Sequence, residues 1–469
     1  MDVRPEGWEA PPVDVEPRLY PPKIELPEQP IAFPAVLAKL ISNPIAAWPK
    51  CVCEDPLYIQ QMPGQKLVHV CNPEIVNTVL LNAGDAFPKT EIDRRLLCPL
   101  VGDSVLTAEG EQWRWQRRTT APLFRHNELL CYVQTMSVAA ERVAGRWRAA
   151  GSTSVQRVDR AMTRATFEII GQTMLPYDDD FDKEAIAGYI EDYLAASTWE
   201  LACSLLRAPT WIPYPRKRRA RAAARAIKKS MAELIGQRKS ANREVDDLLG
   251  RMLAARDPET GNPMSEDKLI DNLATFLLAG HETTASTLTW ALYLLALAPE
   301  WQERLAQEAR EVAGDEPIEA KHIEQLKLTL MVLKEALRLY PPVPILSRIA
   351  ARDLDLGGHH FTKGTVFIIP IYAIHRHKEL WDDPDAFDPY RFDSELQNGR
   401  ARCTFMPFGA GPRICMGASF ALIEATTILA TLVRQFRFRA LPEFEPEPVV
   451  RVTFRPRSGM PLEVTLRET

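Results

Sequence analysis

The chain has 469 residues, of which 46% are hydrophobic and 25% are charged, and its formal net charge is -5 at pH 7. These values are typical of a globular protein with enough apolar residues for a large core. The small net charge gives no reason to expect a nucleic acid as partner. The 8 cysteines have no repeated spacing, which argues against a zinc-binding pair or a disulfide framework.

Residues 1–50 are rich in proline and lack both the basic start and the unbroken apolar run of a signal peptide. They also lack the about 20 successive apolar residues of a membrane-anchoring helix. We therefore expect an extended surface arm and a cytoplasmic protein without a transmembrane anchor. Residues 51–469 contain no linker-like stretch or internal repeat, so we expect them to form one domain.

The first predicted elements are two short strands at residues 57–61 and 66–71, joined by a turn at Pro63 and Gly64. From residue 73 to about residue 255 the patterns are mostly helical, with breaks at prolines and glycines. Within this region, residues 216–229 carry many basic side chains between alanines, which is typical of the solvated face of a helix. Contact of residues 211–229 with a membrane surface stays an open alternative.

A long helix is predicted from Ser265, a good N-cap, to about Ala298. At 1.5 Å per residue it spans about 50 Å, which is enough to cross a domain. The helix is apolar nearly all round, as expected for a buried central helix. A membrane span is the alternative, because Glu282 is the only acidic or basic residue of residues 273–298. The flanks, however, show no asymmetry of basic residues.

Near the C-terminus, residues 449–454 and 461–467 flank the turn-forming residues 458–461, so we expect a hairpin. The predicted fold class is therefore mainly α with small β-sheets near both ends, built around the long central helix.

Residues 405–417, with the sequence FMPFGAGPRICMG, place Cys415 after a glycine-rich loop and just before a predicted helix. Such a loop lets the backbone approach a flat cofactor, and the start of a helix stabilises a thiolate. A thiolate is a ligand of haem iron that favours O–O cleavage. Arg413 can pair with a carboxylate such as a haem propionate. A buried cysteine in a glycine-rich turn is the alternative.

Phe408, Gly411, Arg413, Cys415 and Gly417 match the haem-binding loop of the cytochrome P-450 superfamily, which this segment resembles. The resemblance implies a single-domain cytochrome P-450 fold of the soluble bacterial type, with the long helix over a haem b (iron protoporphyrin IX). Cys415 is then the metal ligand. The further cofactor-binding residues that we expect are Pro407, Phe408, Gly409, Arg413, Gly417, Ala279 and Gly280.

The middle of the long helix reads AGHETT from Ala279 to Thr284. We expect Gly280, which costs about 1 kcal/mol relative to alanine, to admit a flat group or O2 close to the backbone. An adjacent acid and hydroxyl can relay protons, and the resemblance implies Glu282 as proton conduit and Thr283 as the catalytic hydroxyl. A threonine satisfied by the preceding turn is the alternative. Ala285 excludes the HExxH zinc motif.

Cationic and structural partners complete the resemblance. Glu335 and Arg338 form an ExxR motif on one helical face, and with Arg391 they match the family's buried structural cluster. The family pattern also implies propionate contacts for a second group of residues, for which a solvated side chain is the alternative, while the role of His375 stays open. This second group contains Trp113, Arg117 and Arg348.

By resemblance, the protein inserts one oxygen atom from O2 into a hydrophobic small molecule, by C–H hydroxylation or epoxidation. Electrons are expected from a separate ferredoxin or flavodoxin with an NAD(P)H-dependent reductase, docked near Arg114, Arg118 and Arg125. A peroxide-driven haem-thiolate oxygenase and a non-catalytic haem-binding protein or gas sensor are the alternatives. We expect a monomer with an apolar substrate pocket. The pocket residues that we predict are Val105, Leu106, Leu277, His281, Val343, Leu346 and Met460.

Overall fold

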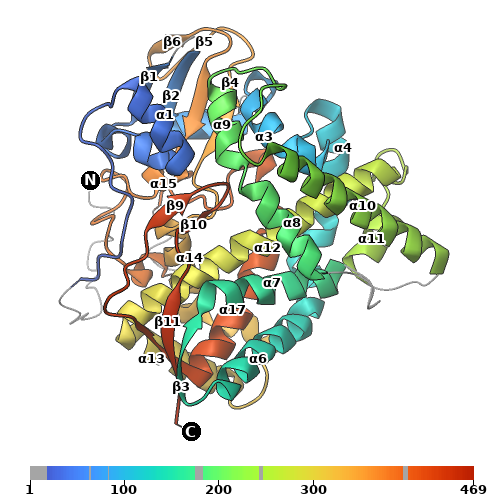
Figure 1. The fold of residues 1–469 in the computed structure, drawn as a ribbon, viewed down its shortest axis with the longest axis vertical. Coiled ribbons are helices and arrows are strands. Elements are labelled where there is room, and N and C mark those ends of the chain that lie inside the picture. Colours follow the sequence, from blue (N-terminus) through green and yellow to red (C-terminus); the bar gives the residue numbers. More distant parts are fainter. Residues whose placement is uncertain are drawn as a thin grey trace.

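The computed structural model is mainly helical, with small sheets, as Figure 1 shows. The predicted fold class is therefore confirmed. In the view of Figure 1 the largest sheet lies at the upper left, and helices fill the centre, the right and the lower part. The residues that the structure describes are 18–62, 65–82, 84–174, 183–241, 247–393 and 400–468.

Helices account for most of residues 73–254 and for most of the core, as predicted. Their bounds are α1 Phe33–Ser42, α2 Pro73–Asn77, α3 Glu91–Val101, α4 Gly110–Thr120, α5 His126–Leu129, α6 Val133–Ala149, α7 Val158–Met174, α8 Lys183–Leu194, α9 Ser197–Leu205, α10 Lys217–Ala241, α11 Leu248–Ala254, α12 Glu266–Leu297, α13 Pro299–Ala313, α14 Lys327–Leu339, α15 Ile371–Ile374 and α17 Ala418–Gln435.

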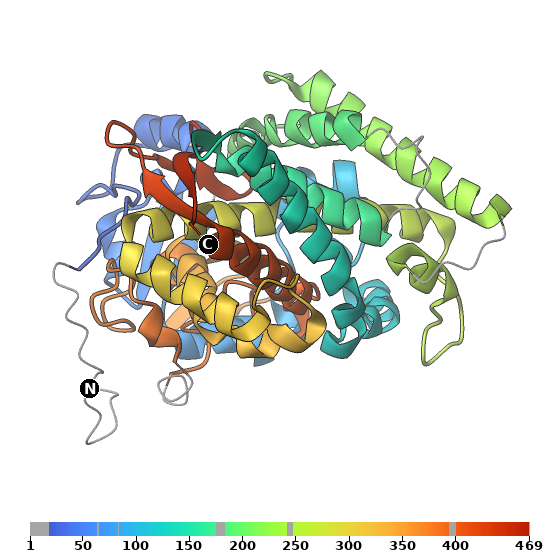
Figure 2. The ribbon, with the colours of Figure 1, turned by 90° about the horizontal axis from the view of Figure 1, so that it is seen from below.

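The predicted central helix is α12, which has 32 residues and runs across the molecule in Figure 2. Ser265 stands at its N-cap with extended backbone, although the Ser265 side chain makes no capping hydrogen bond. Helices α7, α10, α14 and α17 pack against α12, so its apolar faces are covered by protein. Among the described residues, we find no helix with the length and apolarity to cross a bilayer.

Within the described ranges the strands form four small sheets, of which the largest has the order β1-β2-β7-β4. The predicted pair β1–β2 is confirmed as an antiparallel pair, while its expected turn at Pro63 and Gly64 lies outside the described residues. The strand bounds are β1 Leu57–Met62, β2 Gln65–Val70, β3 Thr153–Arg157, β4 Leu346–Ile349, β5 Leu354–Leu356, β6 His359–Phe361, β7 Val366–Ile369, β8 Phe436–Ala440, β9 Pro448–Val450, β10 Phe454–Pro456 and β11 Pro461–Leu466.

The hairpin that we predicted at the C-terminus is wrong. Strand β9 pairs with β10, so residues 449–454 turn back on themselves, while β11 pairs with β3 and β8. Val464 lies opposite Phe438 of β8, and both are buried. Strands β3 and β8 are remote from β11 in the sequence. Pairing with them buries apolar side chains of β11 such as Val464.

The expectation of an extended N-terminal arm is wrong for Phe33–Ser42, which form α1 with a proline in the first turn. Val36 and Leu40, four residues apart, bury one face of α1 against Met62 and Leu67. Residues 1–17 lie outside the described residues. The division into an arm and a domain at residue 50 stays a prediction.

Candidate active site

The loop before α17 holds Cys415 by backbone hydrogen bonds. The Cys415 N–H donates to Phe408 O at 2.9 Å. Gly411 has a φ of 73°, and a Cβ there would lie 2.4 Å from Leu80 O, so this position needs glycine. Gly409 has the same positive φ. The loop therefore turns tightly enough to present the sulfur of Cys415.

The thiol of Cys415 is enclosed by protein on most sides but remains open to solvent. Burial raises its pKa, while the backbone N–H of Gly417 and the guanidinium of Arg117 lower it. An N–H donor and a cation are groups that stabilise a thiolate. The surroundings of Cys415 thus fit a sulfur that carries negative charge when it ligates iron.

Helix α12 is exposed at Ala279 and partly exposed at Thr283, although the preceding residues 273–278 are buried. The Thr283 hydroxyl donates to Ala279 O at 2.6 Å, so it is satisfied by the preceding turn. A hydroxyl that donates in this way can still accept a hydrogen bond. The helix therefore offers a hydroxyl at a place where its surface is open.

Gly280 serves the packing of α12 on α7. A Cβ on Gly280 would lie 2.5 Å from Ile170 Cδ1, which is closer than carbon atoms approach in proteins. The missing side chain makes room for Ile170 of α7, and the expected approach of a flat cofactor or O2 to Gly280 stays a prediction.

His281 is a core residue, which argues against its predicted place in the substrate pocket. Its side chain is buried with the ring edge-on to Phe167 of α7, at a centroid distance of 5.1 Å. Burial lowers the pKa of His281 to about 4, so the ring is neutral at physiological pH. Its two ring nitrogens have no hydrogen-bond partner among the described residues.

The other predicted pocket residues divide by exposure. A side chain that lines a pocket keeps some surface open to it, and Leu106, Val343 and Leu346 do so. Leu277 and Met460 are buried, and Met460 is tied by its backbone N–H to Asp159 Oδ1 at 2.9 Å. Their burial argues against pocket positions. Val105 is also buried.

Arg413, two residues before Cys415, is held in place from several sides. It donates to Ala108 O at 2.7 Å and pairs with Glu109 Oε2 at 2.5 Å. Its guanidinium also lies over the ring of Trp113, 4.1 Å from the centroid. Arg117 donates to Ile414 O at 2.9 Å. Helix α4 and the cysteine loop are thus joined through these side chains.

Positive charge accumulates around Arg413. Burial, assisted by the charges of Arg348 and Arg117, lowers the pKa of Arg413 to about 10. Burial and the charges of Arg413 and Arg348 also lower the pKa of Lys89, to about 8. Burial lowers the pKa of Arg348, and Asp93 and Glu109 oppose this. The carboxylates Asp93 and Glu109 are therefore outnumbered by two in a group whose cations are Lys89, Arg117, Arg348 and Arg413. This excess of positive charge fits the two propionates of haem.

Lys89 and Glu109 belong to this group, and sequence reasoning missed both. The backbone N–H of Lys89 donates to Glu109 Oε1 at 3.1 Å. No motif marks either residue in the sequence. Both lie among other charged residues of the sequence, and single charged side chains are common on protein surfaces.

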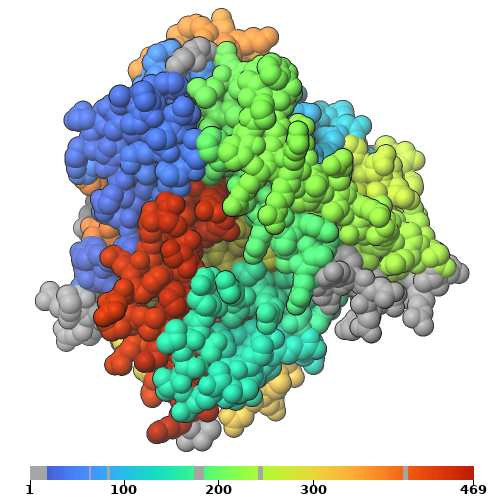
Figure 3. All heavy atoms as spheres, viewed as in Figure 1, coloured from blue at the N-terminus to red at the C-terminus, as the bar shows by residue number. Residues whose placement is uncertain are grey.

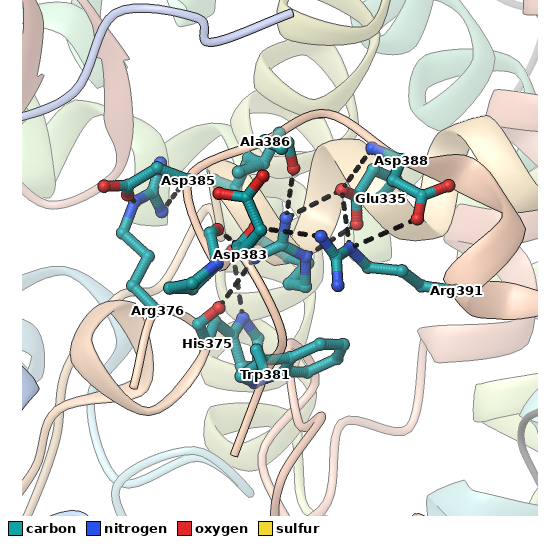
Figure 4. A network of polar contacts seen from close by, with 12 residues as sticks. Glu335, His375, Arg376, Trp381, Asp383, Asp385, Ala386, Asp388 and Arg391 are labelled. Carbon is teal, nitrogen blue, oxygen red and sulfur yellow. Dashed lines mark hydrogen bonds and ion pairs between the residues drawn. The ribbon is translucent and has the colours of Figure 1, made fainter. Parts of the chain in front are cut away.

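Figure 4 shows that the predicted structural residues Glu335 and Arg391 lie together, and the third, Arg338, is bonded to the same carboxylate. Arg338 Nε and Nη2 donate to the two oxygens of Glu335 at 2.6 and 2.7 Å, and both side chains have 0% exposure. Arg391 Nε lies 3.7 Å from Glu335 Oε1. Arg338 also donates to His375 O, Pro384 O and Ala386 O. The cluster therefore ties α14 to residues 375–391.

His375, whose role the sequence left open, connects this cluster to the cysteine loop. Its Nε2 accepts the N–H of Met406 at 3.0 Å, and its Nδ1 lies 3.2 Å from Arg338 O. Burial lowers the pKa of His375 to about 3, so the ring is neutral, with one donor and one acceptor. The ring stacks on Phe405. His375 is therefore a structural residue of the site.

Comparison with known proteins gives a consistent result. The family model described as "Cytochrome P450" matches residues 49–460. Human "Cytochrome P450 4F12" is 30% identical over 429 residues, covering 85% of this chain and 81% of the relative. The "Cytokinin hydroxylase" of Arabidopsis thaliana is 33% identical over 401 residues, covering 83% and 77%. The "Crystal structure of cytochrome P450DA heme domain" aligns with a TM-score of 0.79 at 26% identity, covering 88% of this chain and 90% of that chain.

Proposed function

Since the chain belongs to the cytochrome P450 family, we propose that it inserts one oxygen atom from O2 into a hydrophobic small-molecule substrate, by C–H hydroxylation or epoxidation. The protein is a P450 monooxygenase and its cofactor is haem. The observation that carries the proposal is the adjacent acid and hydroxyl, Glu282 and Thr283, on an open stretch of α12. A protein that only bound haem would have no need of a buried carboxyl there.

Haem bound through a thiolate supplies the activation of O2, and the residues of this chain position it. We propose that Cys415 ligates the iron and that Arg117, Arg348, Arg413 and Lys89 bind the propionates. These cations are at least partly buried and repel one another. An anionic partner offsets both the cost of burying the charges and the repulsion between them, which supports this assignment.

Protons are proposed to pass through Glu282 and Thr283. Burial raises the pKa of the Glu282 carboxyl, which brings its proton exchange closer to neutral pH, where a general acid works best. Thr283 is fixed by its hydrogen bond to Ala279 O and keeps lone pairs for a second hydrogen bond. We therefore assign proton delivery to Glu282 and Thr283.

Electrons are proposed to come from a ferredoxin or flavodoxin with an NAD(P)H-dependent reductase. The docking surface that we expected is less basic than its sequence indicates. Arg114 pairs with Glu111 at 2.6 Å, and Arg118 pairs with Asp257 at 3.3 Å, while Arg125 is exposed. A cytoplasmic location and a monomeric state stay predictions.

A panel of hydrophobic compounds tests the proposed reaction. Holoprotein, NAD(P)H, a partner pair and isotopically labelled O2 should give products that carry one labelled oxygen atom. Thr283→Ala should lower the yield of product per NAD(P)H consumed, because protons are then delivered less directly. Equal or better turnover with H2O2 alone would favour the peroxide-driven alternative. Haem binding without product from any compound would favour a non-catalytic protein.

A further inference from the structure

Glu282 of α12 is paired with a cation of the C-terminal segment. Figure 3 shows that the C-terminal segment that contains β9 and β10, coloured red, and the teal and green helices α7 and α8 border a hollow in the surface. Glu282 Oε1 accepts a hydrogen bond from Arg455 Nη1 at 3.1 Å. The Glu282 side chain is 13% exposed and that of Arg455 is 31% exposed. An ion pair therefore joins the acid of α12 to β10.

The backbone that carries Arg455 is fixed beside α12. The hydroxyl of Ser286, one turn after Glu282, donates to Phe454 O. The N–H of Phe454 donates to Pro342 O at 3.0 Å, and the Phe454 side chain has 0% exposure. Because Phe454 is hydrogen-bonded to both Ser286 and Pro342, the backbone of the adjacent Arg455 is held in place beside Glu282.

Opposing charges decide the protonation of Glu282. Burial raises its pKa, and the carboxylate of Glu191 on α8 acts in the same direction. Arg455 is the largest opposing influence, followed by the hydroxyl of Thr453 and by Arg451. Glu282 Oε2 is buried and has no hydrogen-bond partner within the described part of the chain. One carboxyl oxygen is thus held by a cation, while the other remains able to bind and release a proton.

We propose that Arg455 is a positioning residue for Glu282: its guanidinium fixes one carboxyl oxygen of Glu282 and leaves the other oxygen to exchange the proton. This inference rests on the proposed proton delivery by Glu282. Without the cation, burial and Glu191 would keep Glu282 protonated at higher pH, and its proton would be released less readily.

The test compares Arg455→Met, which keeps the length and removes the charge, with Arg455→Lys, which keeps the charge. In holoprotein, the pH profile of product formed per NAD(P)H should shift to higher pH by about 1 unit or more in Arg455→Met. Arg455→Lys should restore most of the profile. Arg457→Met is the matched control, because Arg457 lies close by in the chain and pairs with Glu447 instead, at 2.6 Å.

Infrared spectroscopy gives a second readout that does not depend on turnover. The C=O band of the Glu282 carboxyl, identified by its loss in Glu282→Gln, should titrate at higher pH in Arg455→Met than in the unchanged protein. An unchanged band position and pH profile in Arg455→Met would overturn the inference. So would equal shifts in Arg455→Met and Arg455→Lys, or a shifted profile that persists in the Glu282→Gln background.

The two readouts separate this inference from the proposed function. If Glu282→Gln left product yield unchanged at every pH, proton delivery through Glu282 would be wrong. The infrared titration would still show whether Arg455 controls the charge of the acid. Unfolding curves and haem content of each variant show whether the fold and the cofactor are kept.

Discussion

At the residue scale, buried carboxyl groups distinguish this site from an ordinary hydrophobic core. Besides Glu282, the core contains Glu424 on α17, which has 0% exposure. Both Glu424 oxygens are without a hydrogen-bond partner among the residues described. Burial raises the pKa of Glu424 to about 8, and the hydroxyl of Thr284 on α12 opposes this rise. Glu424 is therefore mostly neutral at pH 7.

This raised pKa predicts a pH dependence of stability. The folded state binds the Glu424 proton more tightly than the unfolded chain, so the contribution is complete below about pH 4.3, the ordinary pKa of glutamate. It is lost as pH rises through about 8. The loss should amount to a few kcal/mol, on the order of 1.4 kcal/mol per pKa unit.

Glu424→Gln keeps the shape of the side chain and removes the ionisation. Denaturant unfolding of holoprotein from about pH 5 to about pH 9 should show a smaller fall in unfolding free energy for this variant than for the unchanged protein. Exposed Glu443 gives the control Glu443→Gln, which should leave the slope unchanged. Parallel curves for Glu424→Gln and the unchanged protein would show that Glu424 is not held neutral.

Motif residues could be placed from sequence, because the chemistry of a motif is local. Cys415 and Arg413 could be named from the loop that contains them. Lys89 and Glu109 could not be named, and the role of His375 stayed open, because the roles of these residues depend on neighbours elsewhere in the chain. The burial of His281 against Phe167 likewise depends on how α7 and α12 meet.

At the element scale, the contact between α7 and α12 sets the position of the AGHETT segment. Gly280→Ala adds a methyl group that meets Ile170 Cδ1 at 2.5 Å. Alanine favours the helix by about 1 kcal/mol, but overpacking costs about 1–3 kcal/mol. We expect Gly280→Ala to be less stable in denaturant unfolding, and Ile170→Val to relieve part of the loss. A more stable Gly280→Ala variant would contradict this packing.

Long helices were predicted better than strand pairs. The apolar residues and the following proline defined α12 within one residue at each end, because helical hydrogen bonds are local. The partners of β11 are β3 and β8, which are remote in sequence. Alternation of apolar and polar residues predicts a strand, but it does not identify which remote strand pairs with it. Helix α1 was missed because the prolines of the arm suggested extended backbone.

At the scale of the whole molecule, the candidate active site is assembled from segments that are far apart in the chain. Arg117 comes from α4, Thr283 from α12 and Arg348 from β4, while Cys415 precedes α17. The fold class and the long helix followed from pattern, and the family followed from the motifs. The excess of cations over carboxylates could only be recognised once these segments were placed together.

The proposed function depends above all on a sulfur of Cys415 that is deprotonated and bonded to haem iron. The most direct measurement is the absorption spectrum of reduced holoprotein under carbon monoxide. The unchanged protein should show the red-shifted Soret band of a thiolate-ligated haem. Cys415→Ala should lose this band, whereas Cys131→Ser, a change at another exposed cysteine, should keep it. The same spectrum and turnover in Cys415→Ala as in the unchanged protein would contradict the account.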